Sequence, residues 1–260
     1  MTDSTDEGTD ASTDPATAAA VRAALAALAD PDRAAQVARF FQTGPGQYGE
    51  GDVFAGLRLP DIRLVVKRFA GLGLREVETL LTSEVHEHRL AALLILVGRF
   101  RRASRARTRD EVARTRLAEF YLAAVRRGLV NNWDLVDASA PTLLGEYLVD
   151  RPRDVLFDLA AGDSLWERRV AMLASSAFIA HGDATTTLEL AERLLGDQES
   201  LIHKAVGWML REVGKLDRPL LLAFLDEHAG RMPRTALSYA TEHLEPEVRA
   251  RYRAYPRRPA

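Results

Sequence analysis

The tryptophans of this chain stand beside charged residues, which is an unusual combination for a protein interior. Trp133 and Asp137 are four residues apart, so on a helix their side chains share one face. An indole face and a carboxylate both attract positive charge, so this pair could stabilise a cation that develops during a reaction. Arg169, in a second segment of the same kind, carries a planar guanidinium that suits a phosphate. The residue types predict a site where a cation forms close to a bound anion.

Each of these residues also has a purely structural interpretation. Trp133 could pack in the core, as aromatic residues at helical spacing usually do. Asp137 could cap a helix end, and Arg169 could form a surface ion pair with Glu167 or Glu192. The residues alone leave both interpretations open.

The composition sets the class of protein. The chain has 260 residues, a net charge of −2, no cysteine and 47% apolar residues, which is enough for one large core or a continuous solenoid. The missing cysteines exclude disulfides and thiolate metal sites. His86 and His88 are two apart, so on a helix they point to different faces. We therefore expect no metal and no cofactor.

The two ends of the chain differ in charge. Residues 1–15 contain five acidic residues and no Lys or Arg, and are predicted to be a disordered tail. Without those five, the net charge of −2 becomes +3. An acidic start argues against a signal peptide, and no apolar run approaches about 18 residues, the length of a membrane span. We expect a cytoplasmic protein without a membrane segment.

Arginines are concentrated in two further places, and each cluster could be a nucleic-acid footprint or a solvated surface. The chain has only three lysines, so arginine is its usual cation and a single Arg carries little information. The clusters are Arg99, Arg101, Arg102, Arg105, Arg107 and Arg109 in one segment, and Arg249, Arg251, Arg253, Arg257 and Arg258 near the C-terminus.

The apolar pattern has helical spacing throughout. Residues 16–42 predict two short helices, interrupted at Asp30-Pro31. A glycine-rich loop follows over 43–60, and Pro60 then precedes a helix over 61–71. No convincing alternation of period two is present, so the fold class is predicted to be all-α.

Three short segments resemble one another and suggest a repeat. HRLAAL at 88–93 is similar to RRVAML at 168–173 and, more loosely, to HKAVGW at 203–208, with the segment 131–137 between the first two. The spacing of roughly 35 to 40 residues is typical of two-helix solenoid repeats, which stack to leave one concave face. This register predicts a basic ladder of Arg89, Arg169 and Lys204 along that face.

Longer motifs carry a family resemblance. The segments VNNWDLVD at 130–137, LWERR at 165–169 and IHKAVGWMLREVGK at 202–215 resemble the HEAT-like-repeat DNA glycosylases of alkylation repair, the AlkD family. The region from Tyr48 to Pro60 and the segment MPRT at 232–235 look similar as well. The resemblance covers roughly 38–252. It predicts one HEAT-like-repeat domain over 16–252, followed by a basic tail over 253–260.

The resemblance implies a fold and an activity. Members of the family are C-shaped superhelical solenoids that hold duplex DNA in a basic concave groove and excise cationic N3- and N7-alkylated purines without flipping the damaged base. By motif, Trp133 and Trp208 correspond to aromatic residues that contact the deoxyribose of the lesion. Asp137 corresponds to the catalytic carboxylate and Arg169 to an arginine that holds the DNA backbone. Tyr48 corresponds to a DNA-contacting residue of the N-terminal region.

Other assignments complete the predicted site. Arg89 and Lys204 are assigned to DNA binding through the repeat register, and His203 is either structural or phosphate-facing. Trp166 is interpreted as a packing residue. The expected partner is double-stranded DNA with alkylated purines, bound by a monomer that associates with the nucleoid when it binds DNA.

The chemistry of these roles follows from the lesion. An N-alkylated purine already carries positive charge, so its departure needs no general acid. As the glycosidic bond breaks, positive charge moves to the sugar and gives an oxocarbenium-like state. A carboxylate near the anomeric carbon stabilises that state more than the ground state and can orient a water. We expect Asp137 to be ionised at neutral pH, with Arg169 as its counter-charge.

Three alternatives remain. A non-catalytic HEAT-repeat protein could bind damaged or branched DNA by charge and shape, but it would not need the Trp133–Asp137 pair. A protein-binding scaffold would present an apolar or acidic concave face. A Schiff-base lyase would use Lys204 or Lys215 as nucleophile, whereas the matched motif carries an aspartate. The sequence does not determine the preferred lesion.

Overall fold

A computed structural model describes residues 16–255 of the chain. Within this part the fold is all-α, as predicted, and its only β-type pairing is a single bridge between Val53 and Val85. The predicted acidic tail over 1–15 lies outside the described residues, as do residues 256–260 of the predicted basic tail. The last helix ends at Arg253, one residue beyond the predicted end of the domain.

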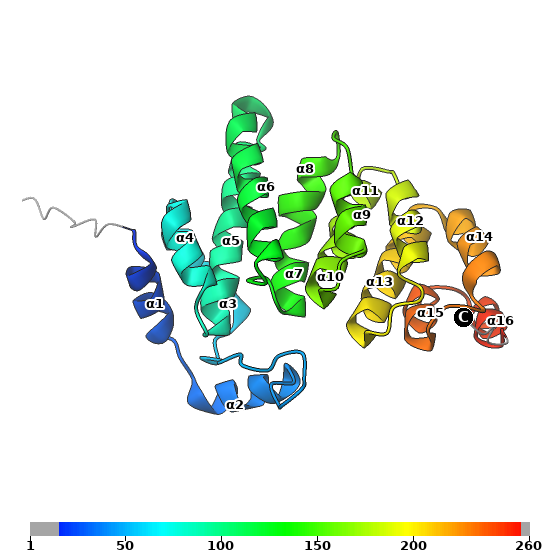
Figure 1. The fold of residues 1–260 in the computed structure, drawn as a ribbon, viewed down its shortest axis with the longest axis horizontal. Coiled ribbons are helices and arrows are strands. Elements are labelled where there is room, and N and C mark those ends of the chain that lie inside the picture. The colour runs from blue at the N-terminus through cyan, green and yellow to red at the C-terminus, as the bar shows by residue number, and fades with distance from the viewer. Residues whose placement is uncertain (1–15, 256–260) are drawn as a thin grey trace, which may run out of the picture.

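The helices stand side by side along the long axis of the molecule (Figure 1). In chain order they are α1 (Ala18–Ala26), α2 (Pro31–Phe40), α3 (Leu59–Arg68), α4 (Leu74–Leu81), α5 (His86–Ala103), the 3-10 turn η1 (Ala106–Thr108), α6 (Glu111–Arg126), α7 (Trp133–Ala140), the π-helical turn η2 (Pro141–Gly145), α8 (Glu146–Leu148), α9 (Asp154–Ala160), α10 (Leu165–Ala174), α11 (Ser176–Ala180), α12 (Thr185–Arg193), α13 (Ser200–Leu216), α14 (Arg218–His228), α15 (Arg234–Ala240) and α16 (Pro246–Arg253).

One row of helices runs through the whole solenoid. In this inner row, α5 packs on α7, α7 on α10, α10 on α13, and α13 on α15. A second row, which includes α4, α6, α9, α12 and α14, packs against the first. The similar sequence segments all fall near the start of inner-row helices, in α5, α7, α10 and α13. The repeat register therefore places equivalent positions side by side.

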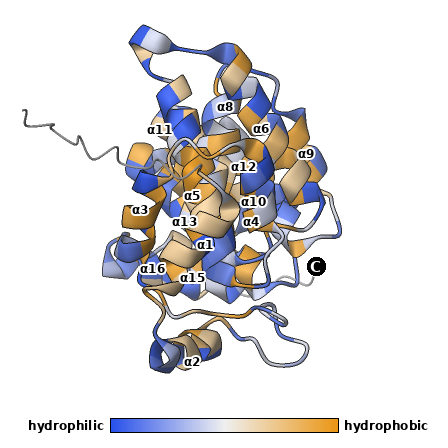
Figure 2. Cartoon of the chain, turned by 90° about the vertical axis from the view of Figure 1, so that its left-hand side faces the viewer, coloured by the Kyte–Doolittle hydropathy of each residue, from blue (hydrophilic) through white to orange (hydrophobic). Residues whose placement is uncertain are grey.

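The apolar core lies between the two rows, as Figure 2 shows from one end of the molecule. Alanine, valine and leucine at helical spacing supply most of it. At Gly207 the packing of α13 on α15 is so close that an added Cβ would lie 2.4 Å from the carbonyl oxygen of Ala236 and 2.5 Å from Cβ of Tyr239. A glycine is therefore required for this approach of two inner helices.

The N-terminal helices match the predicted interruption at Asp30-Pro31. The Asp30 carboxylate accepts a hydrogen bond from the backbone N–H of Arg33 at 3.0 Å, and Pro31 begins α2. Helix α3 begins at Leu59 rather than 61, because Pro60 sits inside its first turn. Helix α2 buries none of its residues and lies apart from the stack (Figures 1 and 2).

The basic segment between 99 and 109 has structural partners. Arg99 donates to the carbonyl of Leu72 at 2.7 Å, and Arg102 donates to the carbonyl of Ala70. Both carbonyls lie in the loop between α3 and α4. Arg109 pairs with Glu111 and Asp150. The structure thus gives this segment a role in joining helices.

Candidate active site

A cleft of about 440 Å³ lies beside the inner row, on the side of the stack where α2 lies (Figure 1). Its walls come from α2 and the following loop, and from α7, α10, α13 and α15. Six of the eight predicted site residues meet in it, including both Trp133 and Trp208. The lining residues are Phe40, Gln42, Tyr48, Trp133, Asp137, Arg169, Leu201, Lys204, Trp208 and Tyr239.

Asp137 and Arg169 form a two-point ion pair at the floor of the cleft. Nε and Nη2 of Arg169 donate to the two carboxylate oxygens at 2.9 and 2.8 Å, and Nη1 donates to the carbonyl of Leu201 at 2.6 Å. Arg169 is only 4% exposed. All three of its nitrogens donate within the protein, so Arg169 forms no surface pair with Glu167 or Glu192.

The carboxylate of Asp137 is oriented by Arg169, close to the end of its helix. It caps no helix end, contrary to the structural alternative, because both oxygens face Arg169. Pro141, four residues later, has no N–H to form the helical hydrogen bond with the backbone carbonyl of Asp137. The chain continues from there as the π-helical turn η2. The side chain of Asp137 keeps an exposed fraction of 18%, so it can reach a ligand in the cleft.

Burial raises the pKa of the Asp137 carboxyl above its ordinary value, although the Arg169 ion pair opposes this and the charge of Asp134 adds to it. Arg169 is thus the counter-charge of Asp137, as expected, but burial outweighs its effect on the pKa. A carboxylate with a raised pKa is a stronger base and is less well solvated, both of which favour its interaction with a cation.

Aromatic residues form one wall of the cleft. Trp133 stacks on Phe41 with ring centres 5.1 Å apart and planes at 10°, and Phe40 meets its edge at 5.9 Å. Phe40 is 66% exposed at the mouth of the cleft. Sequence reasoning missed it, although adjacent phenylalanines at the end of a polar helix were a visible signal. Trp133 is therefore both a packing residue and part of the cleft.

On the opposite wall, Trp208 donates from Nε1 to Glu212 at 3.2 Å, which fixes the indole plane. Glu212 also pairs with Lys215 at 2.8 Å and lies 3.7 Å from Arg211. Lys204 is exposed in the cleft, one turn before Trp208. It is the cation of the predicted ladder that a ligand can reach.

Tyr48 enters the cleft from the loop after α2. Its hydroxyl donates weakly to the carbonyl of Phe40 at 3.4 Å, and its ring meets the edge of Trp166 at 6.2 Å. Burial raises the pKa of Tyr48 and the charge of Asp134 adds to this, although Trp133 and Arg169 oppose it, so the phenol stays protonated. Trp166 packs against the core, as predicted.

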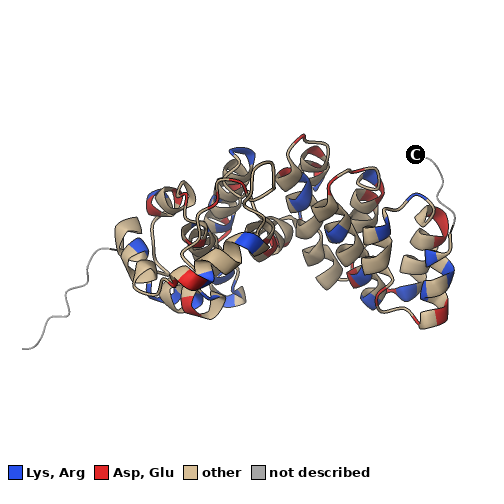
Figure 3. Cartoon of the chain, turned by 90° about the horizontal axis from the view of Figure 1, so that it is seen from below, with Lys and Arg blue, Asp and Glu red and all other residues tan. Residues whose placement is uncertain are grey.

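Two predicted DNA-binding residues have other contacts. Arg89 is 5% exposed and donates to Asp52 at 2.5 Å and to the carbonyl of Ser83 at 3.0 Å. The basic ladder is therefore wrong for Arg89, which is inside the protein. His203 lies 2.6 Å from the carbonyl of Asp197, so its structural interpretation is the one supported. Figure 3 shows Lys and Arg interleaved with Asp and Glu on this side, rather than a continuous basic band.

A match to a family model identifies the family of this chain. A model for the family described as DNA alkylation repair enzyme matches residues 21–244, so the chain belongs to this family. A solved structure described as a predicted DNA alkylation repair enzyme from Enterococcus faecalis is similar in fold, with a TM-score of 0.66. The two chains are 17% identical, and the similarity covers 84% of this chain and 97% of the other. No curated protein matches the chain.

Within the described part of the chain, no helix is both long enough and apolar enough to cross a membrane. Among residues 16–255 there is also no group of three or more His, Cys, Asp or Glu side chains arranged to hold a metal ion.

Proposed function

We propose that this protein is a DNA glycosylase that hydrolyses the N-glycosidic bond of cationic N3- and N7-alkylated purines in duplex DNA. The observation that carries the proposal is the position of Asp137, at the floor of a cleft that also contains Trp133 and Trp208. A family of DNA alkylation repair enzymes supplies the class of substrate.

The charges of the cleft suit a positively charged sugar. Asp137 is buried enough to act in a low effective dielectric, and its exposed edge faces the cleft. Arg169 holds the carboxylate in one orientation before the reaction, so little reorganisation is needed when charge develops. The indoles each add an attraction of about 0.5–2 kcal/mol for a cation over their faces.

Recognition through the sugar also explains how an enzyme could work without flipping the base. An oxocarbenium-like sugar needs an anion, aromatic faces and a water, all of which the cleft can provide without contacting the edge of the purine. A cationic purine leaves without protonation, so the one carboxylate Asp137 suffices. We therefore propose that the lesion is selected by its charge and its weak glycosidic bond, with the base still stacked.

Lys204 provides the proposed phosphate contact. It is exposed in the cleft, whereas Arg169 is engaged with Asp137 and Leu201. We assign the DNA-backbone role first to Lys204 and attribute to Arg169 the orientation of Asp137. We further propose that the protein acts as a monomer in the cytoplasm and is associated with the nucleoid when bound to DNA.

The test is release of free base from duplex DNA that contains N7-methylguanine or N3-methyladenine, measured by chromatography. A duplex with the neutral lesion hypoxanthine is the matched control. We expect release from the cationic lesions only, and no covalent product on borohydride treatment. A borohydride-trapped complex would point to Lys204 as a lyase nucleophile, and tight binding without release would favour the non-catalytic DNA-binding alternative.

A further inference from the structure

A buried charge cluster lies directly behind Trp133, outside the cleft. His86 is 2% exposed at the start of α5. Its Nδ1 lies 3.1 Å from Oδ2 of Asp52, and its Nε2 lies 2.8 Å from Oδ2 of Asp134. A neutral imidazole has one N–H and one lone pair, so one of these contacts would be repulsive. Only the imidazolium can donate to both carboxylates.

The cluster joins the loop after α2 to the first turn of α7. Asp52, in that loop, accepts from Arg89 at 2.5 Å and from Nδ2 of Asn132 at 2.8 Å. The side-chain oxygen of Asn132 accepts from the backbone N–H of Trp133 at 2.8 Å. Two cations, His86 and Arg89, thus face two carboxylates, and the buried charges are balanced as burial requires.

Aromatic rings shield this cluster from water and connect it to the site. His86 contacts Phe41 and Phe54, with ring centres 5.0 and 4.6 Å apart. Phe41 in turn stacks on Trp133. Asp134 directly follows Trp133 and lies three residues before Asp137, within the same short helix. A change at His86 therefore reaches both the indole and the carboxylate of the cleft.

We propose that His86 is a positioning residue of the candidate site, which as an imidazolium between Asp52 and Asp134 fixes the first turn of α7, and with it Trp133, against the loop that carries Tyr48. This inference rests on the proposed function for its effect on catalysis, but not for the charge state of His86. It predicts that an excision reaction that requires no general acid nevertheless depends on a proton.

The charged groups around His86 determine the pH dependence. Asp52 faces it from the loop, Asp134 from α7 and Arg89 from its own helix, while Arg63 of α3 lines the neighbouring cavity. Glu87 is turned away, with its carboxylate on the backbone N–H groups of residues 55–57.

The pKa values of His86 and Asp52 both shift in the direction that keeps these two groups charged. Burial favours the neutral ring, but the hydrogen bonds to Asp134 and Asp52 outweigh it and raise the pKa of His86. Burial likewise opposes ionisation of Asp52, but His86 and Arg89 lower its pKa. Because its pKa is raised in the folded state, the charged His86 stabilises the fold. This contribution is complete below the pKa of His86 in the unfolded chain and is lost as pH rises through the pKa in the folded protein. Because the pKa of Asp52 is lowered in the folded state, its carboxylate contributes stability above its pKa in the unfolded chain. This stability is lost as pH falls through the pKa in the folded protein.

The charge state is measured by NMR of protein labelled with ¹⁵N in its histidine rings, with exposed His243 as internal reference and His86→Gln for assignment. We expect both ring nitrogens of His86 to carry protons at neutral pH, with loss of one proton only in the alkaline range. A single N–H at neutral pH would overturn the proposal.

The positioning role is tested with His86→Gln and, in case that variant does not fold, Asp134→Asn. Protein labelled with 5-fluorotryptophan reports on each indole by ¹⁹F NMR, independently of activity. We expect the Trp133 resonance to move in the variants and in the parent at alkaline pH, with the Trp208 resonance unchanged. Equal movement of both resonances, or of neither, would contradict a positioning role of His86 that is confined to Trp133.

The rate of excision then shows whether the positioning role of His86 matters to the reaction. We expect single-turnover base release by the parent to fall by about 10–100-fold above the pKa of His86, as expected when reacting groups are displaced by about 1 Å. His86→Gln should be slow at neutral pH and lack this alkaline decrease, whereas the matched control His88→Gln should behave as the parent. An unchanged alkaline decrease in His86→Gln would overturn the inference. If the parent releases no base at any pH, the proposed function is contradicted instead. The two NMR measurements then still test the charge state and the positioning role of His86.

Discussion

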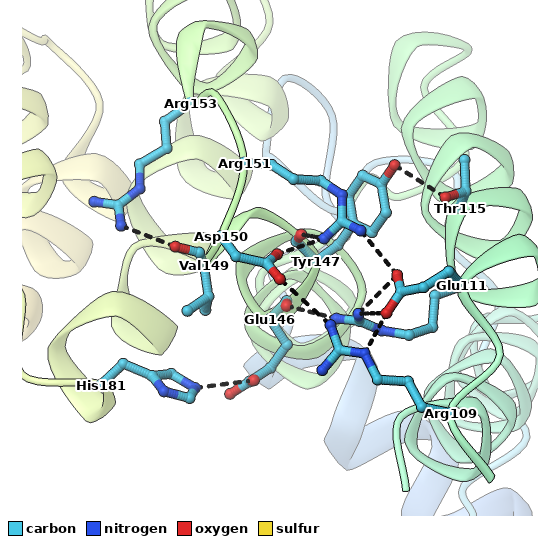
Figure 4. Close-up of polar contacts among 11 residues, drawn as sticks. Arg109, Glu111, Thr115, Glu146, Tyr147, Val149, Asp150, Arg151, Arg153 and His181 are labelled. Carbon is cyan, nitrogen blue, oxygen red and sulfur yellow. Dashed lines mark hydrogen bonds and ion pairs between the residues drawn. The ribbon is translucent and has the colours of Figure 1, made fainter. Parts of the chain in front are cut away.

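Two arginine–carboxylate clusters of the solenoid differ in the exposure of their carboxylates. At the cleft, the side chains of Arg169 and Asp137 are 5% and 18% exposed and bind each other and one carbonyl. In the second cluster, the side chain of Glu111 is 45% exposed and is shared by Arg109, Arg151 and the buried Arg114 (Figure 4). Both clusters join neighbouring helices.

The difference in exposure decides which cluster can do chemistry. An exposed ion pair is screened by water and salt, and contributes little to stability or to the reactivity of its carboxylate. A buried pair pays a desolvation cost, so each partner depends strongly on the other. The arginines of the sequence look alike, but we propose that the buried Arg169–Asp137 pair is the one that prepares a carboxylate for a cationic ligand.

Removal of Arg169 should have the largest effect on folding. Arg169→Ala leaves Asp137 buried without its partner, and we expect a loss of about 3–5 kcal/mol in the free energy of unfolding. Denaturant unfolding at neutral pH measures this. The matched control is Arg109→Ala in the exposed cluster, whose midpoint should stay close to that of the parent. Equal losses in the two variants would refute the distinction between the clusters.

The pH dependence of excision should show the burial of Asp137. Because burial raises its pKa, the carboxylate is protonated at a higher pH than an ordinary aspartate. We expect single-turnover base release to decline on acidification through that raised pKa. In Arg169→Lys, which keeps the charge but loses the two-point contact, the decline should begin at higher pH. A pH profile that is flat down to the ordinary pKa of aspartate would contradict this.

Lys204 should affect binding more than stability. Replacing it with Gln should reduce the slope of log K against log salt by about 0.9, the loss of one phosphate contact. Lys215→Gln is the matched control, because Lys215 is paired with Glu212 and does not line the cleft. Fluorescence anisotropy of a labelled duplex over a range of salt concentrations gives both slopes. A similar change in both variants would remove Lys204 from the proposed interface.

The smallest effect is expected in the exposed cluster. The hydrogen bond from Arg109, together with the Arg114 pair, lowers the pKa of Glu111 to about 2. Since Glu111 is exposed, this shift should shrink towards the ordinary value in about 1 M salt, where the Debye length is near 3 Å. Glu111→Gln should leave excision almost unchanged, and it should lower the unfolding midpoint less than Arg169→Ala does, because the partner that buried Arg114 loses is itself exposed. NMR titration of the carboxyl at low and high salt measures the shift, and a salt-independent pKa would contradict the comparison.

Patterns that repeat along the chain allowed much of the fold to be predicted. Apolar residues at helical spacing predicted an all-α protein, and the similar segments correctly placed equivalent turns in the inner row. The motif around Trp133 and the segment around Trp208 predicted residues that meet in one cleft. The remaining roles of these residues, including catalysis by Asp137, stay predictions.

Partners that are distant in sequence could not be predicted. Arg89 was expected to face DNA, but its carboxylate partner Asp52 is 37 residues away in a glycine-rich loop without periodicity. The same loop brings Asp52 to His86, and so the charge cluster behind Trp133 was missed. Arg169 was placed in the correct cleft, but its burial depends on the packing of α10 between α7 and α13. A local pattern predicts the face of a helix, whereas ion pairing depends on the neighbours that tertiary packing supplies.

The most direct test of the central claim is the rate of base release by Asp137→Asn. This variant keeps the size of the side chain but removes the charge that is proposed to stabilise the sugar cation. Parent and variant are compared in single-turnover reactions on the same duplex with N7-methylguanine, with duplex affinity measured in parallel. We expect the rate to fall by about 10²–10³, the effect of losing one preorganised electrostatic group, while affinity stays equal or rises slightly. Excision at the parental rate by Asp137→Asn would contradict the account.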